Sequence, residues 1–244
     1  MKAIVLAGGR GTRLAPYTTV FPKPLVPIGE RPILDIVLRQ LAAAGFDQVT
    51  LAVGYLAELI MAYCGDGSRY GIELTYSREE KPLGTAGPIA LAPVAEETFL
   101  AMNGDLLTTI DYRAMLASHR DRGSIATVAT FPRDVTIELG VIEADENDRV
   151  TDYLEKPHFQ YAVSTGVYLF EPAILDHIPR GERFDLPDLV LRLIRLGLPV
   201  GRYAASGYWL DIGRHDDYAE AVRLFESHRA EFLPGETGTG AEPQ

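Results

Sequence analysis

A glycine-rich turn near the start of the chain is the first group of residues that could carry chemistry. The apolar run Ala3–Ala7 leads directly into residues 8–13, which read GGRGTR. Glycines just beyond a strand let backbone N–H groups approach an anion without an intervening side chain. Arg13 and, after a proline-rich segment, Lys23 could supply positive charge against a polyphosphate. This stretch predicts a nucleotide-phosphate site at the C-terminal edge of the first strand.

Other interpretations of the loop have less support. GGRGTR lacks the lysine and hydroxyl residue that end a P-loop. A dinucleotide fingerprint, as in a nicotinamide-dependent oxidoreductase, needs a helix to begin at its third glycine, and the prolines at 16, 22, 24 and 27 disfavour one. By itself the loop could also be a plain tight turn, so the phosphate interpretation depends on agreement with other segments.

Two aspartates that follow other buried strands could hold a metal ion. Asp105 comes after a strand-like run in the tripeptide NGD, and Asp211 ends another such run in YWLDIG. In open α/β sheets, ligands bind at the C-terminal ends of the strands. Each aspartate alone could simply cap a turn or a helix. Together, beside a phosphate loop, they predict an oxygen-liganded Mg²⁺ ion that offsets the phosphate charge.

Two further segments have both a structural and a functional interpretation. Glu155-Lys156 follows a predicted hairpin strand, where a solvated ion pair is the default. Beside a phosphate site, Lys156 could hold a second phosphate, and Glu155 could accept hydrogen bonds from sugar hydroxyls. Gly84-Thr85 could be a helix N-cap, and the missing side chain at Gly84 would also let a flat base approach the backbone.

The elements that must position these residues alternate between strand and helix in the first half of the chain. We expect strands at 3–7, 49–53, 72–76 and 98–102, and helices at 32–44, 55–63 and 112–122. This alternation predicts right-handed βαβ units and therefore a Rossmann-like α/β fold with a mostly parallel central sheet flanked by helices.

The second half adds a β-hairpin to this pattern. Its expected strands are 125–131, 140–144, 150–154, 162–170, 200–203 and 208–211, and its expected helices are 172–178, 186–196 and 215–229. The segments 140–144 and 150–154 flank a polar turn and form the hairpin. We expect one domain over residues 1–232 and a disordered tail over residues 233–244.

Composition limits the classes of partner. The net charge of −11 over 244 residues argues against a nucleic-acid or anionic-membrane binder. Cys64 is the single cysteine, so an intrachain disulfide is excluded, and no apolar run approaches the length of a membrane span. Met1-Lys2 leads straight into the first strand, which predicts no signal peptide. We therefore expect a cytoplasmic protein that acts on small molecules.

Seven motifs follow one another along the chain: LAGGRGTRL, FPKPLVPIG, PLGTAGPIALA, NGD, LEKP, STGVYLF and YWLDIG. In this order they resemble the sugar-1-phosphate nucleotidyltransferases, from Met1 to about Tyr218. Within that family the chain is most similar to mannose-1-phosphate guanylyltransferases, chiefly through PLGTAGPIALA. The resemblance implies the nucleotide-diphospho-sugar transferase fold. It also implies transfer of a nucleoside monophosphate from an NTP, with GTP favoured, to mannose 1-phosphate or a related sugar 1-phosphate, with release of pyrophosphate.

The resemblance also implies roles for individual residues. The catalytic residues would be Arg13, Lys23, Asp105, Lys156 and Asp211, with Asp105 and Asp211 binding Mg²⁺. The nucleotide would be bound by Leu6, Ala7, Gly8, Gly9, Gly11, Thr12, Arg13, Lys23, Glu79, Gly84, Thr85, Asn103 and Asp105. The sugar phosphate would be bound by Gly140, Glu155, Lys156, Thr165 and Gly166.

Several alternatives stay open at this point. Residues 164–166 read STG, where guanylyltransferases usually read NAG, and the threonine–glycine pair is closer to glucose-1-phosphate thymidylyltransferases. A thymidylyl- or uridylyltransferase for glucose 1-phosphate, a guanylyltransferase for an unusual sugar or cyclitol phosphate, and a transferase for a non-sugar phosphate all remain. A regulatory relative without catalysis would be expected to lose the charged residues that this chain keeps. The oligomeric state is open, with a homodimer among the options.

Overall fold

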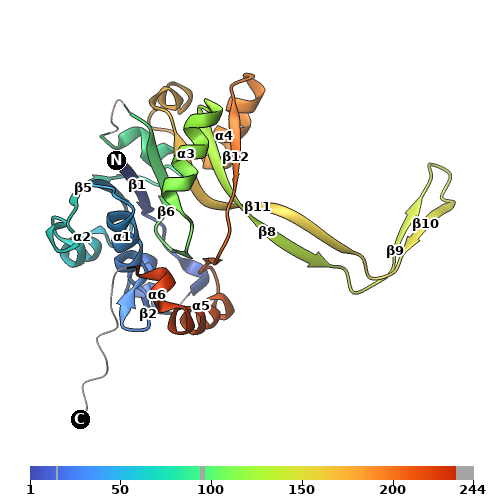
Figure 1. The fold of residues 1–244 in the computed structure, drawn as a ribbon, viewed down its shortest axis with the longest axis horizontal. Helices are drawn as coiled ribbons and strands as arrows, with labels where there is room; N and C mark the ends of the chain where they lie inside the picture. Colours follow the sequence, from blue (N-terminus) through green and yellow to red (C-terminus); the bar gives the residue numbers. More distant parts are fainter. Residues whose placement is uncertain (15, 94–96, 235–244) are drawn as a thin grey trace, which may run out of the picture.

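The computed structural model describes residues 1–14, 16–93 and 97–234. Figure 1 shows a layered body from which a long two-stranded arm projects. The body is built on a seven-stranded sheet with the strand order β12-β8-β11-β6-β1-β4-β5. Its strands are β1 (Lys2–Ala7), β4 (Gln48–Val53), β5 (Glu73–Arg78), β6 (Phe99–Asn103), β8 (Ala126–Thr136), β11 (His158–Phe170) and β12 (Val200–Ala204).

The predicted mostly parallel sheet is confirmed. β1 pairs in parallel with β4 and β6, β4 pairs in parallel with β5, and β12 pairs in parallel with β8. β11 is antiparallel to both β6 and β8. The first half of the chain is therefore the βαβ part that the alternating pattern predicted, and β11 introduces the change of direction.

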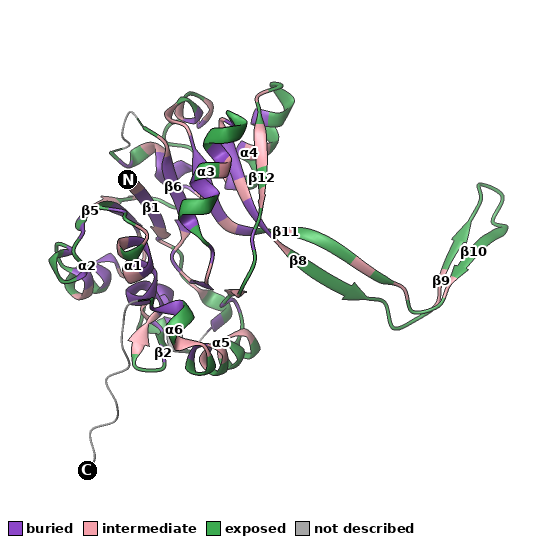
Figure 2. Ribbon diagram, viewed as in Figure 1, coloured by how far each residue is buried: buried purple, intermediate pink, exposed green. Residues whose placement is uncertain are grey.

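Helices cover both faces of this sheet. They are α1 (Ile33–Ala43), α2 (Ala57–Cys64), α3 (Tyr112–Arg122), α4 (Leu186–Arg195), α5 (His215–Ser227) and α6 (Arg229–Phe232). Neighbouring residues of β1 point to opposite faces: Val5 belongs to a core cluster with α1, α2, α3 and α5, and Ile4 to a second cluster with α4. Figure 2 shows the resulting buried residues along the sheet of the body.

Local signals account for where several helices begin and end. Asp111 precedes α3 and accepts a hydrogen bond from the backbone N–H of Ala114 at 2.9 Å. Gly123 ends the same helix in the left-handed conformation, with φ at 58°. The segments 87–91 and 172–177 form short 3₁₀ helices, so the predicted helix at 172–178 is present in this tighter form.

The arm is the largest departure from the predicted elements. β8 and β11 continue outward beyond the sheet and there pair only with each other, from Val163↔Phe131 to His158↔Thr136. At the far end, β9 (Val141–Ala144) and β10 (Val150–Leu154) form the hairpin predicted at 140–144 and 150–154. We call residues 131–163 the arm. The prediction missed its two-stranded stem, because Pro132 and several charged residues interrupt the apolar pattern that marks a buried strand.

The C-terminal end of the described chain packs on the body. Leu233, which fell within the predicted disordered tail, is 2% exposed and lies in the larger core cluster. The rest of that predicted tail, residues 235–244, lies outside the described residues. Within the described ranges, no helix is both long and apolar enough to cross a membrane.

Candidate active site

A cavity of about 910 Å³ lies where β1, β4, β5 and β6 end. This is the carboxyl edge of the sheet, where open α/β folds bind ligands. The cavity brings together all thirteen residues that were predicted to bind a nucleotide, which were scattered over the first 105 residues of the chain. These residues are Leu6, Ala7, Gly8, Gly9, Gly11, Thr12, Arg13, Lys23, Glu79, Gly84, Thr85, Asn103 and Asp105.

The first glycine of the loop lies directly against a carboxylate. A Cβ atom at Gly8 would lie 2.6 Å from Oε1 of Glu79, and one at Gly54 would lie 2.8 Å from the same atom. The other oxygen of Glu79 accepts a hydrogen bond from the backbone N–H of Leu83 at 2.9 Å. Glu79 is therefore held in one orientation at the wall of the cavity, between the ends of β1 and β4.

The proline-rich segment delivers Lys23 to the cavity. Residues 23–25 form a 3₁₀ turn after Pro22, and the Lys23 side chain is only 9% exposed. Gly11 has a φ of +62°, and a Cβ atom there would lie 2.8 Å from Cβ of Lys23. The hydroxyl of Thr18 donates to the carbonyl of Gly11 at 2.8 Å. The glycine loop and the lysine segment are thus packed against each other as one unit.

Lys23 joins the two predicted metal ligands. Its ammonium group contacts Oδ2 of Asp105 and lies 3.7 Å from Oδ1 of Asp211. The two aspartates meet because the short strands β7 (Leu106–Thr108) and β13 (Trp209–Asp211) pair antiparallel and place Asp211 opposite Leu106. Sequence reasoning expected the strand that ends in Asp211 but not its partner β7.

Partial burial changes the acidity of Asp211. Burial raises the pKa of Asp211, and the neighbouring Asp105 carboxylate raises it further. Lys23 and Arg13 act in the opposite direction because their positive charges favour the ionised carboxylate. Arg13 therefore lies within electrostatic reach of Asp211, and its guanidinium would be 3.4 Å from a Cβ atom at Gly213.

The donor set suits a metal ion that is shared with a phosphate substrate. The described ranges contain no group of three or more His, Cys, Asp or Glu side chains able to hold a metal ion by themselves. Mg²⁺ commonly takes one or two carboxylates and completes its shell with water and substrate phosphates. Two carboxylates that meet at the edge of one cavity fit that pattern, with Lys23 offsetting part of their charge.

The opposite wall of the cavity depends on residues that sequence reasoning missed. Asp185 accepts a hydrogen bond from the backbone N–H of Thr85 at 2.9 Å, and the Thr85 hydroxyl accepts one from Leu186 at 2.8 Å. A Cβ atom at Gly84 would lie 2.6 Å from the Asp185 carboxylate. The glycine at position 84 is therefore required by this packing. No local pattern links Thr85 to a residue 100 positions later.

Most of the other lining residues that the prediction missed are charged, and two charged stretches of the sequence could have indicated several of them. Arg10 is part of the glycine loop itself, and Arg78, Glu80 and Lys81 flank Glu79 in the run SREEK. The charge run around Glu79 and the arginine within GGRGTR were the available signals. The missed polar and charged lining residues are Arg10, Tyr55, Arg78, Glu80, Lys81, Arg183 and Asp185.

The predicted sugar-phosphate residues fall into two groups. Thr165 and Gly166 lie at the base of the arm, where a Cβ atom at Gly166 would be 2.6 Å from Nδ2 of Asn103, a cavity residue. Gly140, Glu155 and Lys156 lie on the arm itself, and no residue of the arm lines the cavity of its own chain. Figure 1 shows the β9–β10 end of the arm held well away from the body.

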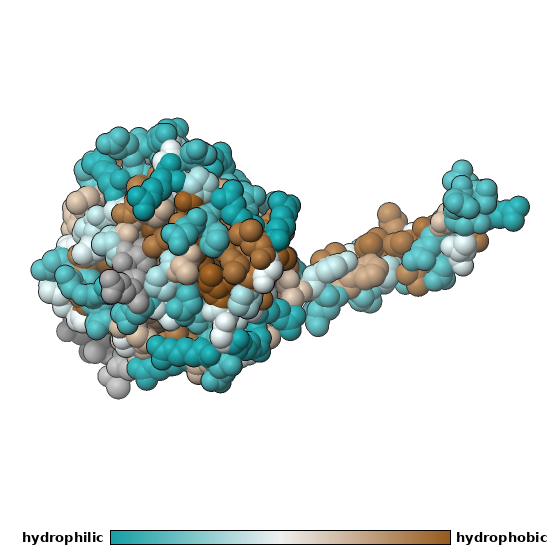
Figure 3. Space-filling view, turned by 90° about the horizontal axis from the view of Figure 1, so that it is seen from above, coloured by the Kyte–Doolittle hydropathy of each residue, from teal (hydrophilic) through white to brown (hydrophobic). Residues whose placement is uncertain are grey.

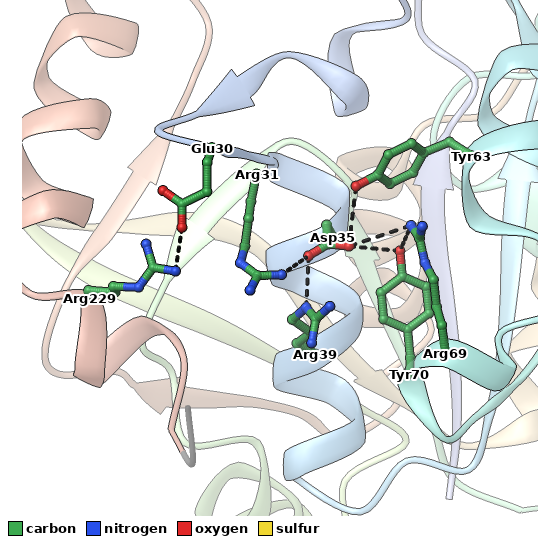
Figure 4. A network of polar contacts seen from close by, with 8 residues as sticks. All are labelled: Glu30, Arg31, Asp35, Arg39, Tyr63, Arg69, Tyr70 and Arg229. Atoms are coloured by element: carbon green, nitrogen blue, oxygen red, sulfur yellow. Dashed lines mark hydrogen bonds and ion pairs between the residues drawn. The ribbon is translucent and has the colours of Figure 1, made fainter. Parts of the chain in front are cut away.

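A buried carboxylate stabilises the body behind the cavity. Asp35 on α1 accepts hydrogen bonds from Arg31 at 3.1 Å, Arg39 at 2.8 Å and Tyr70 at 3.0 Å (Figure 4). Burial raises the pKa of Asp35, but these hydrogen bonds and the charge of Arg39 outweigh that effect and hold the pKa below its usual value. None of these residues lines the cavity. The hydrogen bond from Tyr70 to Asp35 connects α1 to the turn at residues 68–70, so the cluster has a structural role.

Comparison with known proteins agrees with this geometry. The nucleotidyl transferase family model matches residues 2–228. A UTP–glucose-1-phosphate uridylyltransferase of Synechocystis is 37% identical over 243 residues, which cover 91% of this chain and 63% of that protein. A mannose-1-phosphate guanylyltransferase of Mycobacterium tuberculosis is 35% identical over 249 residues, which cover 95% of this chain and 69% of that protein. The chain thus spans about two thirds of the length of these relatives.

A solved structure shares most of this architecture. The crystal structure of HddC from Yersinia pseudotuberculosis complexed with GMP-PN superimposes with a TM-score of 0.71 at 25% sequence identity, covering 92% of this chain and 99% of that one. The family model, the relatives and the shared fold all extend over most of the chain. By this agreement, the chain belongs to the nucleotidyl transferase family.

Proposed function

We propose that this chain transfers a nucleoside monophosphate from an NTP to a sugar 1-phosphate, with release of pyrophosphate. The observation that carries the proposal is the single cavity in which the glycine loop, Lys23 and Asp105 meet, with Asp211 beside them. GTP and mannose 1-phosphate, or a related sugar 1-phosphate, are the favoured substrates. Glucose 1-phosphate with UTP or dTTP is the alternative, in keeping with the activity named for the Synechocystis relative.

The reaction needs alignment and charge more than it needs a base. A phosphate oxygen of the sugar 1-phosphate attacks the α-phosphorus in line, and the bond from that phosphorus to the oxygen bridging to the β-phosphate breaks. The attacking oxygen is already anionic, so no proton has to be removed. The barrier comes from bringing two polyanions together in the correct geometry, which positioned cations and backbone donors lower.

The residues of the cavity divide this work between them. Backbone N–H groups of the glycine loop would bind the triphosphate, and Arg13 and Lys23 would offset the charge that builds on the departing pyrophosphate. A Mg²⁺ ion held by Asp105 and Asp211 would supply further positive charge at the phosphates. Lys156 would hold the phosphate of the sugar, with Glu155 and the segment at 165–166 contacting the sugar itself.

The orientation of Glu79 supports guanine as the base. Guanine presents two adjacent N–H donors on its Watson–Crick edge, and a carboxylate can accept both. Uracil and thymine present one donor there. Since Leu83 and the packing against Gly8 fix the carboxylate of Glu79, its position is set before the base arrives.

Pyrophosphate release over a matrix of NTPs and sugar 1-phosphates, with Mg²⁺ present, tests the proposal. We expect release with GTP and mannose 1-phosphate, and no release when Mg²⁺ is replaced by a chelator. Release only with UTP or dTTP would overturn the base assignment and leave the transferase assignment intact. No release with any pair, from protein whose circular dichroism shows it to be folded, would refute the transferase activity.

A further inference from the structure

The stem of the arm has one mostly apolar face, and beyond Phe131, which packs against Trp209 at its base, its own chain leaves this face largely uncovered. Cross-strand partners on this face are Phe131 with Val163, Arg133 with Tyr161, and Val135 with Phe159. Tyr161 is 54% exposed and Val135 41% exposed. The opposite face is more polar, and polar side chains on its two strands contact each other there. For example, the Gln160 side chain donates a hydrogen bond to Asp134. An amphipathic antiparallel sheet normally buries its apolar face.

The hairpin at the end of the arm repeats this asymmetry. Tyr153 lies opposite Ile142, and Val150 lies opposite Ala144, on the same face of the hairpin. Ile142, Tyr153 and Val150 are 58%, 58% and 65% exposed. Figure 3 shows hydrophobic residues, in brown, on the surface along the arm. A two-stranded hairpin is marginally stable in water unless its apolar face is packed, and exposed apolar patches of this kind mark interaction sites.

The arm leaves the body as a continuous two-stranded ladder. Six consecutive cross-strand pairs, from Val163↔Phe131 to His158↔Thr136, hold β8 and β11 together outside the sheet. Its base is also fixed: the Thr165 hydroxyl donates to the carbonyl of Ala129 at 2.9 Å, and Trp209 donates to the carbonyl of Thr165 at 2.9 Å. Thr165 is 1% exposed. The direction in which the arm leaves the body is therefore built into the fold.

The proposed active site is incomplete without the arm. Under the proposed function, the sugar phosphate needs a positive group distinct from those that bind the triphosphate. Lys156, the residue expected to supply that charge, lies on an arm that contributes nothing to the cavity of its own chain. The structure thus separates the two halves of the predicted site.

We propose that the arm is exchanged between two copies of this chain. The arm of one copy crosses the body of the other and places Glu155 and Lys156 at the open side of the other copy's cavity. The inference rests on the proposed function for the role of Lys156, but the exchange itself does not. A two-fold axis makes the contact reciprocal, so a dimer contains two composite sites, each with a cavity from one copy and an arm tip from the other.

Charge and surface chemistry support a second copy as the occupant. The arm carries eight acidic residues and three basic ones. The cavity is lined by six basic residues against four acidic ones, in a chain whose net charge is −11. Val20 and Phe21, between the glycine loop and Lys23, are 64% and 56% exposed. The region around the cavity thus offers the positive charge and the apolar contacts that the acidic, half-apolar arm lacks.

Mixing two inactive variants gives the decisive test. Asp105→Asn disables the cavity and Lys156→Ala disables the arm. When the two are co-expressed with different tags, a mixed dimer has one intact site, formed by the cavity of the Lys156→Ala copy and the arm of the Asp105→Asn copy. Half of the dimers are mixed, so we expect about one quarter of the wild-type specific activity. If each arm serves its own chain, the mixture shows only the sum of the two residual activities, which overturns the exchange.

A mass measurement separates this inference from the proposed function, because it needs no activity. Sedimentation equilibrium should give a species of twice the 26.8 kDa chain mass. The double variant Ile142→Asp/Tyr153→Asp, on the apolar face of the hairpin, should sediment as a monomer. The matched control Glu143→Gln/Asp152→Asn changes the opposite face and should stay dimeric, since Asp152 pairs with Glu143 there. A wild-type monomer, or a dimer that survives the apolar-face variant, would contradict the inference.

Discussion

Replacing Asp105 by asparagine removes one charge from the centre of the proposed site while keeping its shape. Lys23 contacts the Asp105 carboxylate with only 9% of its own side chain exposed. In the variant, Lys23 keeps Asp211 at 3.7 Å, so its buried charge is not left without a partner. We therefore expect a stability loss at the lower end of the range for a hydrogen bond to a charged group, about 1.5 kcal/mol. For a chain of this size that lowers the melting temperature by roughly 3–6 °C.

The catalytic effect should be much larger than the effect on stability. Loss of one preorganised electrostatic group typically lowers kcat by about 100- to 1,000-fold, equivalent to ~2.7–4 kcal/mol of transition-state stabilisation. The Mg²⁺ concentration that gives the half-maximal rate should rise, because the variant loses one of the two carboxylates proposed to hold the metal. The assay is steady-state pyrophosphate release with the NTP varied, repeated over a range of Mg²⁺ concentrations.

The matched control for this variant is Asp217→Asn. Asp217 lies close enough to Asp211 to raise its pKa, but its substitution takes away the same charge without touching Lys23. We expect the control to keep kcat within about threefold, as for a change of long-range, partly screened charge. A folded Asp105→Asn protein with a kcat near that of the control would refute the role given to Asp105.

Three other outcomes follow from the geometry. Gly8→Ala places a Cβ atom 2.6 Å from the Glu79 carboxylate, which must shift and strain its hydrogen bond from Leu83. We expect a cost of about 1 kcal/mol and a melting temperature lower by a few degrees. Gly9→Ala, with nothing within 4 Å of its Cβ atom, should leave the melting temperature unchanged, and equal melting curves for the two variants would contradict the packing. Asp35 has a pKa held below its usual 3.8, so its ionised form contributes stability above that pH and the contribution is lost as the pH falls through the lowered value. Urea midpoints should thus show Asp35→Asn weaker than wild type at pH 7 and converging with it in acid, and a constant difference at all pH values would contradict this. Burial raises the pKa of the Cys64 thiol to about 12, so an aromatic disulfide reagent should label it only in urea; rapid labelling of the native protein would argue against that burial.

The body and the nucleotide side of the site were predictable because each rests on a local pattern. Apolar runs such as residues 3–7 and 98–102 marked buried strands, and the residues just beyond them had to meet at one edge of the sheet. That rule placed Asp105 beside the glycine loop although the two are far apart in the sequence. Asp211 reaches the same place by another route, because β13 pairs with β7, the unexpected strand that directly follows Asp105.

The Asp185 wall of the cavity and the stem of the arm could not be predicted, because they depend on contacts that leave no local pattern in the sequence. Asp185 reaches Thr85 across 100 residues, and its identity carries no sign of that partner. The stem of the arm alternates polar and apolar residues from 158 to 161, but Pro132 and the charged residues on the opposite strand interrupt the apolar pattern of a buried strand. Beyond Phe131, its apolar face also has no counterpart among the described residues of the body, so a search for a single core could not find it.

The attachment of the arm has a consequence for how this protein can diverge. From residue 132 to residue 166, no side chain belongs to either core cluster. Substitutions, insertions or deletions between residues 132 and 163 would therefore leave the folding of the body largely untouched, whereas Thr165 and Gly166 are packed into it. If the arm contacts the sugar acceptor as proposed, selection can change the acceptor-facing residues without disturbing the cavity proposed for the nucleotide. Acceptor preference and nucleotide preference can then evolve separately in a protein with this layout.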